Sequence, residues 1–187
     1  MELSYIEKIV GGDVSQYTYF INRYKDMAYT IAFRIVNNKQ DAEEIVQDSF
    51  LKAYNALSKF KGDSKFSTWF YKIVVNTSLS KIKRKISFSA DVDLSEVGDA
   101  LAENIEGAYS KLAKAEQKKI IQTALAALEM EDSLLLTLYY LNQNSIEEIS
   151  AITGIPPENI KMKLHRARKK MYGILSNTLK TEMKYLL

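Results

Sequence analysis

Six lysine and arginine side chains lie within ten residues near the C-terminal end of the chain, in the segment KMKLHRARKK of residues 161–170. Clustered cations can bind the phosphates of a nucleic acid, and arginine can also donate paired hydrogen bonds to the edge of a base. The same cations could instead form a solvated helix surface or bind the headgroups of a membrane. These three interpretations make different demands on the neighbouring residues.

The basic segment follows a predicted helix–turn–helix at residues 145–171. We expect a first helix at about 146–153, a turn at Gly154, and a second helix that begins at a proline, 156 or 157. The core-facing stripe of the second helix is predicted to consist of Ile160, Leu164, Ala167 and Met171. That stripe packs on the first helix and is not free for lipid, which argues against a membrane. No acid occurs from residue 159 to 179, which argues against a merely solvated surface.

Nucleic acid is therefore the favoured target of the second helix. Its outward face and flanks, which we expect to contact DNA, carry Glu158, Asn159, Lys161, Met162, Lys163, His165, Arg166, Arg168 and Lys169. The flanking cations suit phosphates, and the outward residues suit the major groove. His165 is more plausibly a DNA contact than a catalyst, because no Ser, Asp or Cys constellation supports it.

A second group of residues whose side chains could have a chemical role lies in residues 59–85. At 100° per residue, one helical stripe carries Trp69, Lys72, Asn76 and Lys83. One large aromatic ring, one amide and two cations on a single helix face are an unusual combination. Two simpler interpretations remain open. Trp69 could be a core residue, and the cations from Lys81 to Lys85 could be a solvated helix end.

Helical periodicity predicts the elements that position these side chains. Helices are expected at about 14–36, 40–58, 108–128 and 134–141, with a loop at 62–64 before the Trp69 helix. The segment 134–141 is apolar enough to be a buried helix; a strand is the alternative, but the helices on both sides favour the helix. The N-terminal half of the helix at 40–58 is acidic, which the helix dipole favours.

Composition limits the class of protein. The chain has 187 residues, no cysteine and a net charge of +3. Residues 1–85 have a net charge of +5 (14 basic, 9 acidic) and residues 111–187 of +4 (12 basic, 8 acidic), whereas residues 86–110 contain six acids and no base. We expect two basic modules joined by an acidic linker, in a reducing cytoplasm, without a signal peptide or membrane span. No metal, phosphate-loop or dinucleotide motif is present, so an enzyme is not predicted.

Three segments in this order resemble the extracytoplasmic-function sigma factors of bacterial RNA polymerase. They read DAEEIVQDSFLKAY (41–54), FKGDSKFSTWFYKIVVNTSLSKIKRK (60–85) and SIEEISAITGIPPENIKMKLHRARKK (145–170). The resemblance implies an all-α protein of two small helical domains. Region 2 would span 1–85, the acidic linker 86–107, and region 4, with the helix–turn–helix, 108–187.

The resemblance also implies partners for each surface. Asp41, Glu44, Gln47 and Asp48 would dock on the clamp helices of the polymerase, and region 4 on its flap. The minus-ten promoter element would be melted and held by Lys61, Ser64, Phe66, Trp69, Lys72, Asn76, Lys81, Lys83 and Arg84, and the outward face of the basic helix would read the minus-thirty-five element. An anti-sigma protein is a further expected partner, and no small-molecule substrate or cofactor is expected.

Some residues depart from the family's pattern. The Leu-Pro pair and following Arg that family members carry before the helix–turn–helix are Leu128-Glu129 and Ser133 here, and the recognition helix opens with Asn159-Ile160-Lys161-Met162-Lys163. The DNA sequence recognised at the minus-thirty-five element therefore cannot be transferred from other family members to this protein. Two alternatives are a stand-alone helix–turn–helix regulator, which leaves the Trp69–Asn76 stripe unexplained, and a helical protein-interaction module.

Overall fold

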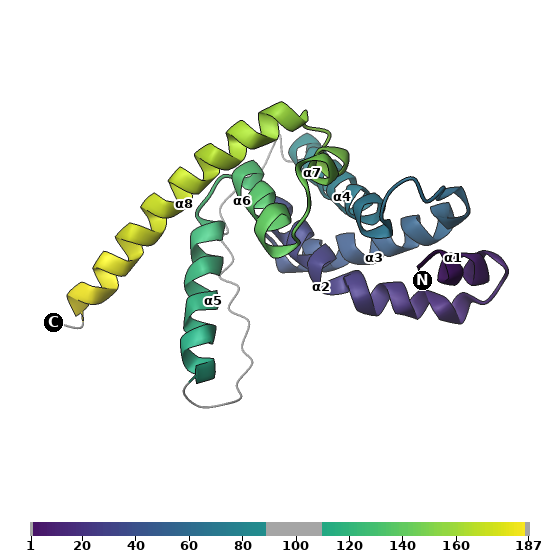
Figure 1. The fold of residues 1–187 in the computed structure, drawn as a ribbon, viewed down its shortest axis with the longest axis horizontal. Helices are drawn as coiled ribbons and strands as arrows, with labels where there is room; N and C mark the ends of the chain where they lie inside the picture. Colours follow the sequence, from purple (N-terminus) through teal and green to yellow (C-terminus); the bar gives the residue numbers. More distant parts are fainter. Residues whose placement is uncertain (1, 89–109, 186–187) are drawn as a thin grey trace.

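A computed structural model describes residues 2–88 and 110–185. All regular elements in those ranges are helices, so the predicted all-α class is confirmed (Figure 1). In chain order they are α1 (Glu2–Val10), the 3-10 turn η1 (Val14–Gln16), α2 (Tyr17–Val36), α3 (Lys39–Ala56), the 3-10 turn η2 (Leu57–Lys59), α4 (Phe66–Phe88), α5 (Ser110–Ala126), α6 (Met130–Leu136), the π-helical turn η3 (Thr137–Leu141), α7 (Ile146–Thr153) and α8 (Pro157–Tyr185). None of the helices in these ranges is long and apolar enough to cross a membrane.

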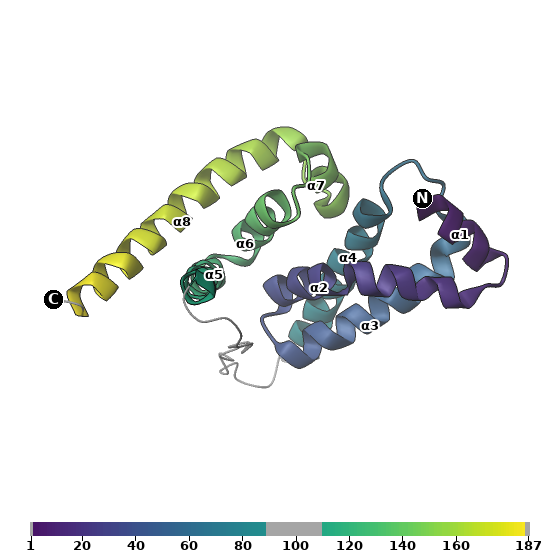
Figure 2. The ribbon, with the colours of Figure 1, turned by 60° about the horizontal axis from the view of Figure 1, so that its bottom comes forward.

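The N-terminal region is a bundle of α2, α3 and α4, with α1 at one end (Figure 2). The apolar stripe of α2 lies in its core, where the rings of Phe20 and Phe66 are 4.2 Å apart between centroids. The chain reverses between α2 and α3 at Asn37, which adopts a left-handed conformation with φ 47°. Asn38 then caps α3, because its side-chain oxygen accepts a hydrogen bond of 3.0 Å from the backbone N–H of Asp41.

The helix–turn–helix forms as the sequence predicts. Ser145 and Glu148 form a capping box at the start of α7, in which each side chain accepts from the other's backbone N–H. Gly154 ends α7 at φ 76°, a conformation that glycine adopts without strain. Of the predicted α8 stripe, Ile160, Leu164 and Ala167 are buried, and Met171 is half-buried against the same cluster. The backbone thus presents the remaining faces of α8 away from the core.

One helix type and two helix ends differ from the sequence-based expectation. The segment 134–141 is helical, but η3 adopts the wider π geometry, in which the N–H of Asn142 donates to the carbonyl of Thr137. Apolar periodicity over eight residues does not distinguish the two helix types. Helix α8 extends to Tyr185 rather than ending near 170, and α4 extends to Phe88. The remainder of the predicted linker, 89–107, lies outside the described residues.

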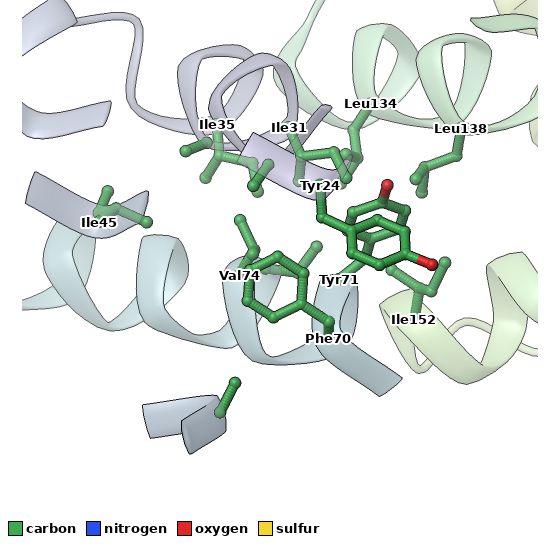
Figure 3. Packing of buried hydrophobic residues seen from close by; sticks show 14 of the residues in the cluster. Tyr24, Ile31, Ile35, Ile45, Phe70, Tyr71, Val74, Leu134, Leu138 and Ile152 are labelled. Atoms are coloured by element: carbon green, nitrogen blue, oxygen red, sulfur yellow. The ribbon is translucent and has the colours of Figure 1, made fainter. Parts of the chain in front are cut away.

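The N-terminal and C-terminal regions contact each other through one buried cluster (Figure 3). Helix α7 packs on α4, and α6 packs on α2. The buried rings of Tyr24 and Tyr71 lie toward Leu138 and Ile152, as Figure 3 shows. This packing was not predicted from the sequence, which indicates two modules but not how they meet.

Candidate nucleic-acid interface

The outward face of α8 is exposed along the stretch predicted to contact DNA. Eight of its nine predicted residues are exposed, and Lys163 is half-buried; the exposed ones are Glu158, Asn159, Lys161, Met162, His165, Arg166, Arg168 and Lys169. The guanidinium of Arg166 lies 3.8 Å from the sulfur of Met162, one turn earlier. An arginine and a thioether therefore lie side by side at the centre of this face, where a major groove would present base edges.

Two cations of α8 have acidic partners in α6 or just before it. Lys163 pairs with Glu131, and Lys170 lies 2.6 Å from Asp132 and 3.2 Å from Glu129. The hydrogen bonds to Asp132 and Glu129 raise the pKa of the Lys170 ammonium. These pairs join α8 to α6 and to Glu129, which directly precedes α6. By contrast, Lys161, Arg166 and Lys169 have no ion-pair partner among the residues that the structure describes.

A second exposed face lies on α4 and carries the predicted stripe. Lys72 and Asn76 are exposed, and Trp69 is half-buried. The Trp69 ring packs against Phe60 and Phe66, with centroids 5.1 Å and 5.5 Å away. The Trp69 side chain is therefore packed on the bundle on one side and still partly accessible. Aromatic packing fixes the ring in a position where it can form the wall of a base-binding pocket.

The loop before α4 is exposed, apart from its last predicted contact residue. Lys61 and Ser64 are accessible to a ligand, and Gly62 adopts φ 78° at the loop's bend. Phe66 is only 2% exposed and packs in the core. We therefore correct the prediction that Phe66 contacts DNA: it anchors the start of α4, since an aromatic side chain there completes the buried cluster.

The basic end of α4 contacts the acidic start of α3. Lys83 and Arg84 are exposed, whereas Lys81 lies 2.5 Å from Glu44 and 3.4 Å from Asp41. The predicted DNA contact Lys81 is therefore already paired with two predicted polymerase contacts. The sequence gives no sign of this pairing, because the helices lie some 40 residues apart and only their packing brings these ends together.

One part of the acidic face of α3 is paired with α4, and the rest is exposed. Glu44, Gln47 and Asp48 are exposed, whereas the Asp41 side chain is only 14% exposed. Partial burial alone would raise the pKa of the Asp41 carboxyl, but the hydrogen bond and charge of Lys85, together with Lys81, hold that pKa below its ordinary value of 3.8. The Asp41 carboxylate thus pairs mainly with Lys85 and Lys81 of the same chain.

One exposed apolar residue of this face was missed by the sequence reasoning. Leu51 is 63% exposed and lies one turn after Asp48. The spacing of Glu44, Asp48 and Leu51, at steps of four and three, is the signal that would have found it. A leucine between exposed polar groups suits the apolar part of a protein interface.

Comparison with known proteins relates these surfaces to a family. Residues 20–86 match the family described as Sigma-70 region 2, and residues 118–171 match Sigma-70, region 4. The chain is 29% identical to the ECF RNA polymerase sigma factor SigW of Bacillus subtilis over 173 residues, which cover 88% of this chain and 91% of that one. It is 32% identical to the ECF RNA polymerase sigma-E factor of Escherichia coli K12 over 171 residues, 88% of each chain.

Solved structures share the fold. The sigma factor RpoE of Bartonella quintana, solved in complex with the anti-sigma factor NepR, superposes with a TM-score of 0.71 at 21% identity, covering 85% of this chain and 96% of that one. CnrH, in complex with the cytosolic domain of CnrY, gives a TM-score of 0.64 at 18% identity over 92% and 96%. With these matches in the predicted order along the chain, the protein belongs to the ECF family of RNA polymerase sigma factors, which direct the initiation of transcription at promoters.

Proposed function

We propose that the chain recruits core RNA polymerase to a subset of promoters through three surfaces, on α3, α4 and α8. Residues 1–85 would form the polymerase-binding and minus-ten module, and residues 108–187 the minus-thirty-five module. The acidic segment 86–107 would connect them and avoid the DNA, since its charge repels phosphate. The observation that carries the proposal is the presence of two separate exposed faces suited to nucleic acid on one chain, one with a tryptophan and an amide and the other with a basic helix.

The polymerase surface is proposed to be the exposed part of α3. Glu44, Gln47 and Asp48 would meet basic groups of the clamp helices, with Leu51 as an apolar contact between them. For Asp41 we propose a structural role beside this surface. Its carboxylate already bonds Lys85 at 2.5 Å, so its contribution is to hold α3 and α4 together beside the docking face.

Promoter melting is proposed to use the loop 61–65 and the exposed side of α4. A base that leaves the stack must be held by a pocket that offsets the cost of unpairing. Trp69 would stack on such a base, Asn76 would bond its edge, and Lys72, Lys83 and Arg84 would neutralise the strand's phosphates. The fixed position of the Trp69 ring, between Phe60 and Phe66, supports this assignment.

Recognition at minus thirty-five is proposed to use the exposed face of α8. Arg166, Met162 and His165 lie where base edges would be read, and Lys161 and Lys169 lie where phosphates would be contacted. Lys163 would contribute less than the sequence suggests, because it is paired with Glu131.

We further propose that the chain catalyses no reaction itself, since the polymerase performs the chemistry, and that it acts in the cytoplasm. The flap of the polymerase and an anti-sigma protein are proposed as additional partners. The relatives RpoE and CnrH were each solved with such a protein or with a partner's cytosolic domain, which supports the second of these.

The decisive experiment is run-off transcription with purified core polymerase, with and without this protein, from a library of genomic fragments. New start sites that depend on the protein, together with co-migration of protein and polymerase on gel filtration, are the expected result. If the protein binds duplex DNA as a dimer but neither joins the polymerase nor creates start sites, the stand-alone regulator is the correct assignment.

A further inference from the structure

The loop proposed to hold the melted strand is anchored at both ends by aromatic rings. Phe60, just before the loop, and Phe66, at the start of α4, pack edge to face with ring centroids 5.9 Å apart, and both rings pack on Trp69. Between these anchors, residues 61–64 form no backbone–backbone hydrogen bond with any described residue. The middle of the loop therefore depends on side-chain contacts to keep one conformation.

One such contact comes from α1, which lies beside the segment that joins α3 to α4 (Figure 2). The loop bends at Gly62, whose φ of 78° suits a glycine. A methyl group on residue 62 would lie 3.3 Å from Cδ2 of Leu3 and 3.9 Å from its Cδ1. Leu3 thus fills the space that a side chain of residue 62 would occupy, and it covers the bend from a different helix.

Leu3 is not part of the core of the bundle. The buried apolar residues of α1 are Ile6 and Ile9, whereas Leu3 is 55% exposed and lies outside the buried cluster. Val10, at the opposite end of the same helix, is also 55% exposed. The contact with the bend is therefore the feature that distinguishes Leu3 from an ordinary exposed apolar residue.

Helix α1 is fastened to α2 by polar and aromatic contacts. The ring of Tyr5 stacks on that of Tyr19, with centroids 4.3 Å apart and an angle of 5° between the planes. The carboxylate of Glu2 accepts a hydrogen bond from the hydroxyl of Tyr24, whose ring centroid lies 5.4 Å from that of Phe66. These contacts fix the position of α1 beside the loop and connect it to the aromatic cluster at the start of α4.

We propose that α1 positions the minus-ten loop and that Leu3 is a positioning residue for the capture of an unstacked base. Leu3 contacts no base itself. It keeps the bend at Gly62 in one conformation before DNA binds, so that less conformational entropy is lost on binding. The inference rests on the proposed function and deepens it. The segment that matches Sigma-70 region 2 begins at residue 20, so α1 lies outside that match.

The test compares Leu3→Ala with Val10→Ala in the full chain, because both substitutions shorten an equally exposed apolar residue of α1. Each protein is titrated with a single-stranded oligonucleotide that carries the minus-ten sequence of a promoter found by run-off transcription. Quenching of the Trp69 fluorescence gives the Kd of the oligonucleotide. The affinity of each variant for core polymerase is measured in parallel.

Leu3→Ala should raise the Kd of the oligonucleotide about fivefold, and Val10→Ala should leave it unchanged. Leu3→Met, which keeps an apolar side chain of similar size, should restore the natural value. Polymerase affinity should be the same for all of these proteins. Equal oligonucleotide affinity of Leu3→Ala and the natural chain would overturn the proposal. A matching loss of polymerase affinity would also overturn it, because Leu3 would then have a general structural role.

A double-mutant cycle tests the contact itself. Gly62→Ala introduces a methyl group that is strained at the positive φ of the bend and that also meets Leu3. The backbone strain is common to both backgrounds, so the non-additive part of the change in Kd measures the contact between the two residues. Gly62→Ala should therefore weaken oligonucleotide binding about threefold less in the Leu3→Ala protein than in the natural chain. Purely additive effects would contradict the proposed contact.

A measurement without DNA separates this inference from the proposed function. Trypsin should cleave after Lys61 or Lys65 about threefold faster in the folded Leu3→Ala protein than in Val10→Ala, because a loop that opens more often is cut more often. Mass spectrometry identifies the cleaved bond. Equal cleavage rates would overturn the role of Leu3, whether or not the chain directs transcription. If the cleavage rates differ but the natural chain does not bind the oligonucleotide, the proposed melting function is wrong instead.

Discussion

The ammonium of Lys85 lies 2.5 Å from Oδ2 of Asp41, which joins the end of α4 to the start of α3. Lys81 approaches the other carboxylate oxygen of Asp41 at 3.4 Å. This pair places a proposed DNA-binding helix end beside a proposed polymerase-binding helix. The exposed residues around the pair, rather than the pair itself, are available to partners, and this distinction sets the first two predictions.

Asp41→Asn should leave polymerase affinity nearly unchanged but reduce stability in a pH-dependent way. Because the pKa of Asp41 is lowered in the folded state, its stabilising contribution is present above the ordinary value of pH 3.8 and is lost as the pH falls below it. Urea unfolding at several pH values should therefore show a gap between natural and variant proteins at neutral pH that closes in acid. A gap that is the same at every pH would contradict this assignment.

Asp48→Arg should weaken binding to core polymerase by roughly tenfold or more, because a reversed charge would meet the basic groups of the clamp helices. Asp48 is exposed and forms no ion pair among the described residues, so the fold should be unaffected. Polymerase affinity, measured by fluorescence anisotropy, is compared with duplex DNA binding by the same variant. Equal losses of both would indicate misfolding instead.

Trp69 is the only tryptophan in the chain, so its fluorescence reports on the proposed pocket without interference. A single-stranded oligonucleotide carrying a minus-ten element should quench it as a base stacks on the ring. Asn76→Ala should raise the concentration needed for quenching by about tenfold. Ser80→Ala, an exposed position one turn further along α4, is the matched control and should behave like the natural chain.

Arg166→Ala should weaken binding to the cognate upstream element by about 1–3 kcal/mol, and binding to random DNA by much less, if the guanidinium reads a base edge. Lys161→Ala should weaken both alike and lower the slope of affinity against salt by about one, as a phosphate contact does. Titrations of both duplexes at several salt concentrations separate these outcomes. If Arg166→Ala weakened binding to both duplexes equally, Arg166 would be a phosphate contact and not a base contact.

Phe66→Ala should lower the free energy of unfolding by about 3–5 kcal/mol, because the side chain fills the core between α2 and α4. Lys61→Ala, in the exposed loop just before it, should change stability by no more than about 0.5 kcal/mol. Chemical denaturation measures both. A stable Phe66→Ala protein with a specific defect in DNA binding would restore the original assignment of Phe66 to the interface.

Much of the local structure could be predicted from the sequence, because it depends on short-range chemistry. The helix–turn–helix follows from a capping serine, a glycine at a positive φ, a proline at the start of a helix, and apolar residues at helical spacing. The same periodicity placed Phe20 and Ile31 in the core. The π geometry of η3 could not be predicted, since α and π turns bury the same apolar run.

The candidate site was predicted only in part, for a similar reason. Periodicity assigns a residue to a face of its own helix, so Asn76 and Arg166 were correctly expected to be exposed. It does not show what a neighbouring helix contributes. The burial of Phe66 and the pairing of Lys163 with Glu131 both depend on side chains that come from other elements.

The sequence by itself thus determined the helices, the exposed faces and the family, because each is encoded in local spacing and residue type. Only the tertiary structure decided which charges are free and how the two modules meet. Tyr71 and Ile152 lie some 80 residues apart, and neither reveals in its local sequence that it will be buried against the other module. Contacts of that kind arise from the shapes of whole helices after they pack, and they join the two modules through one buried cluster.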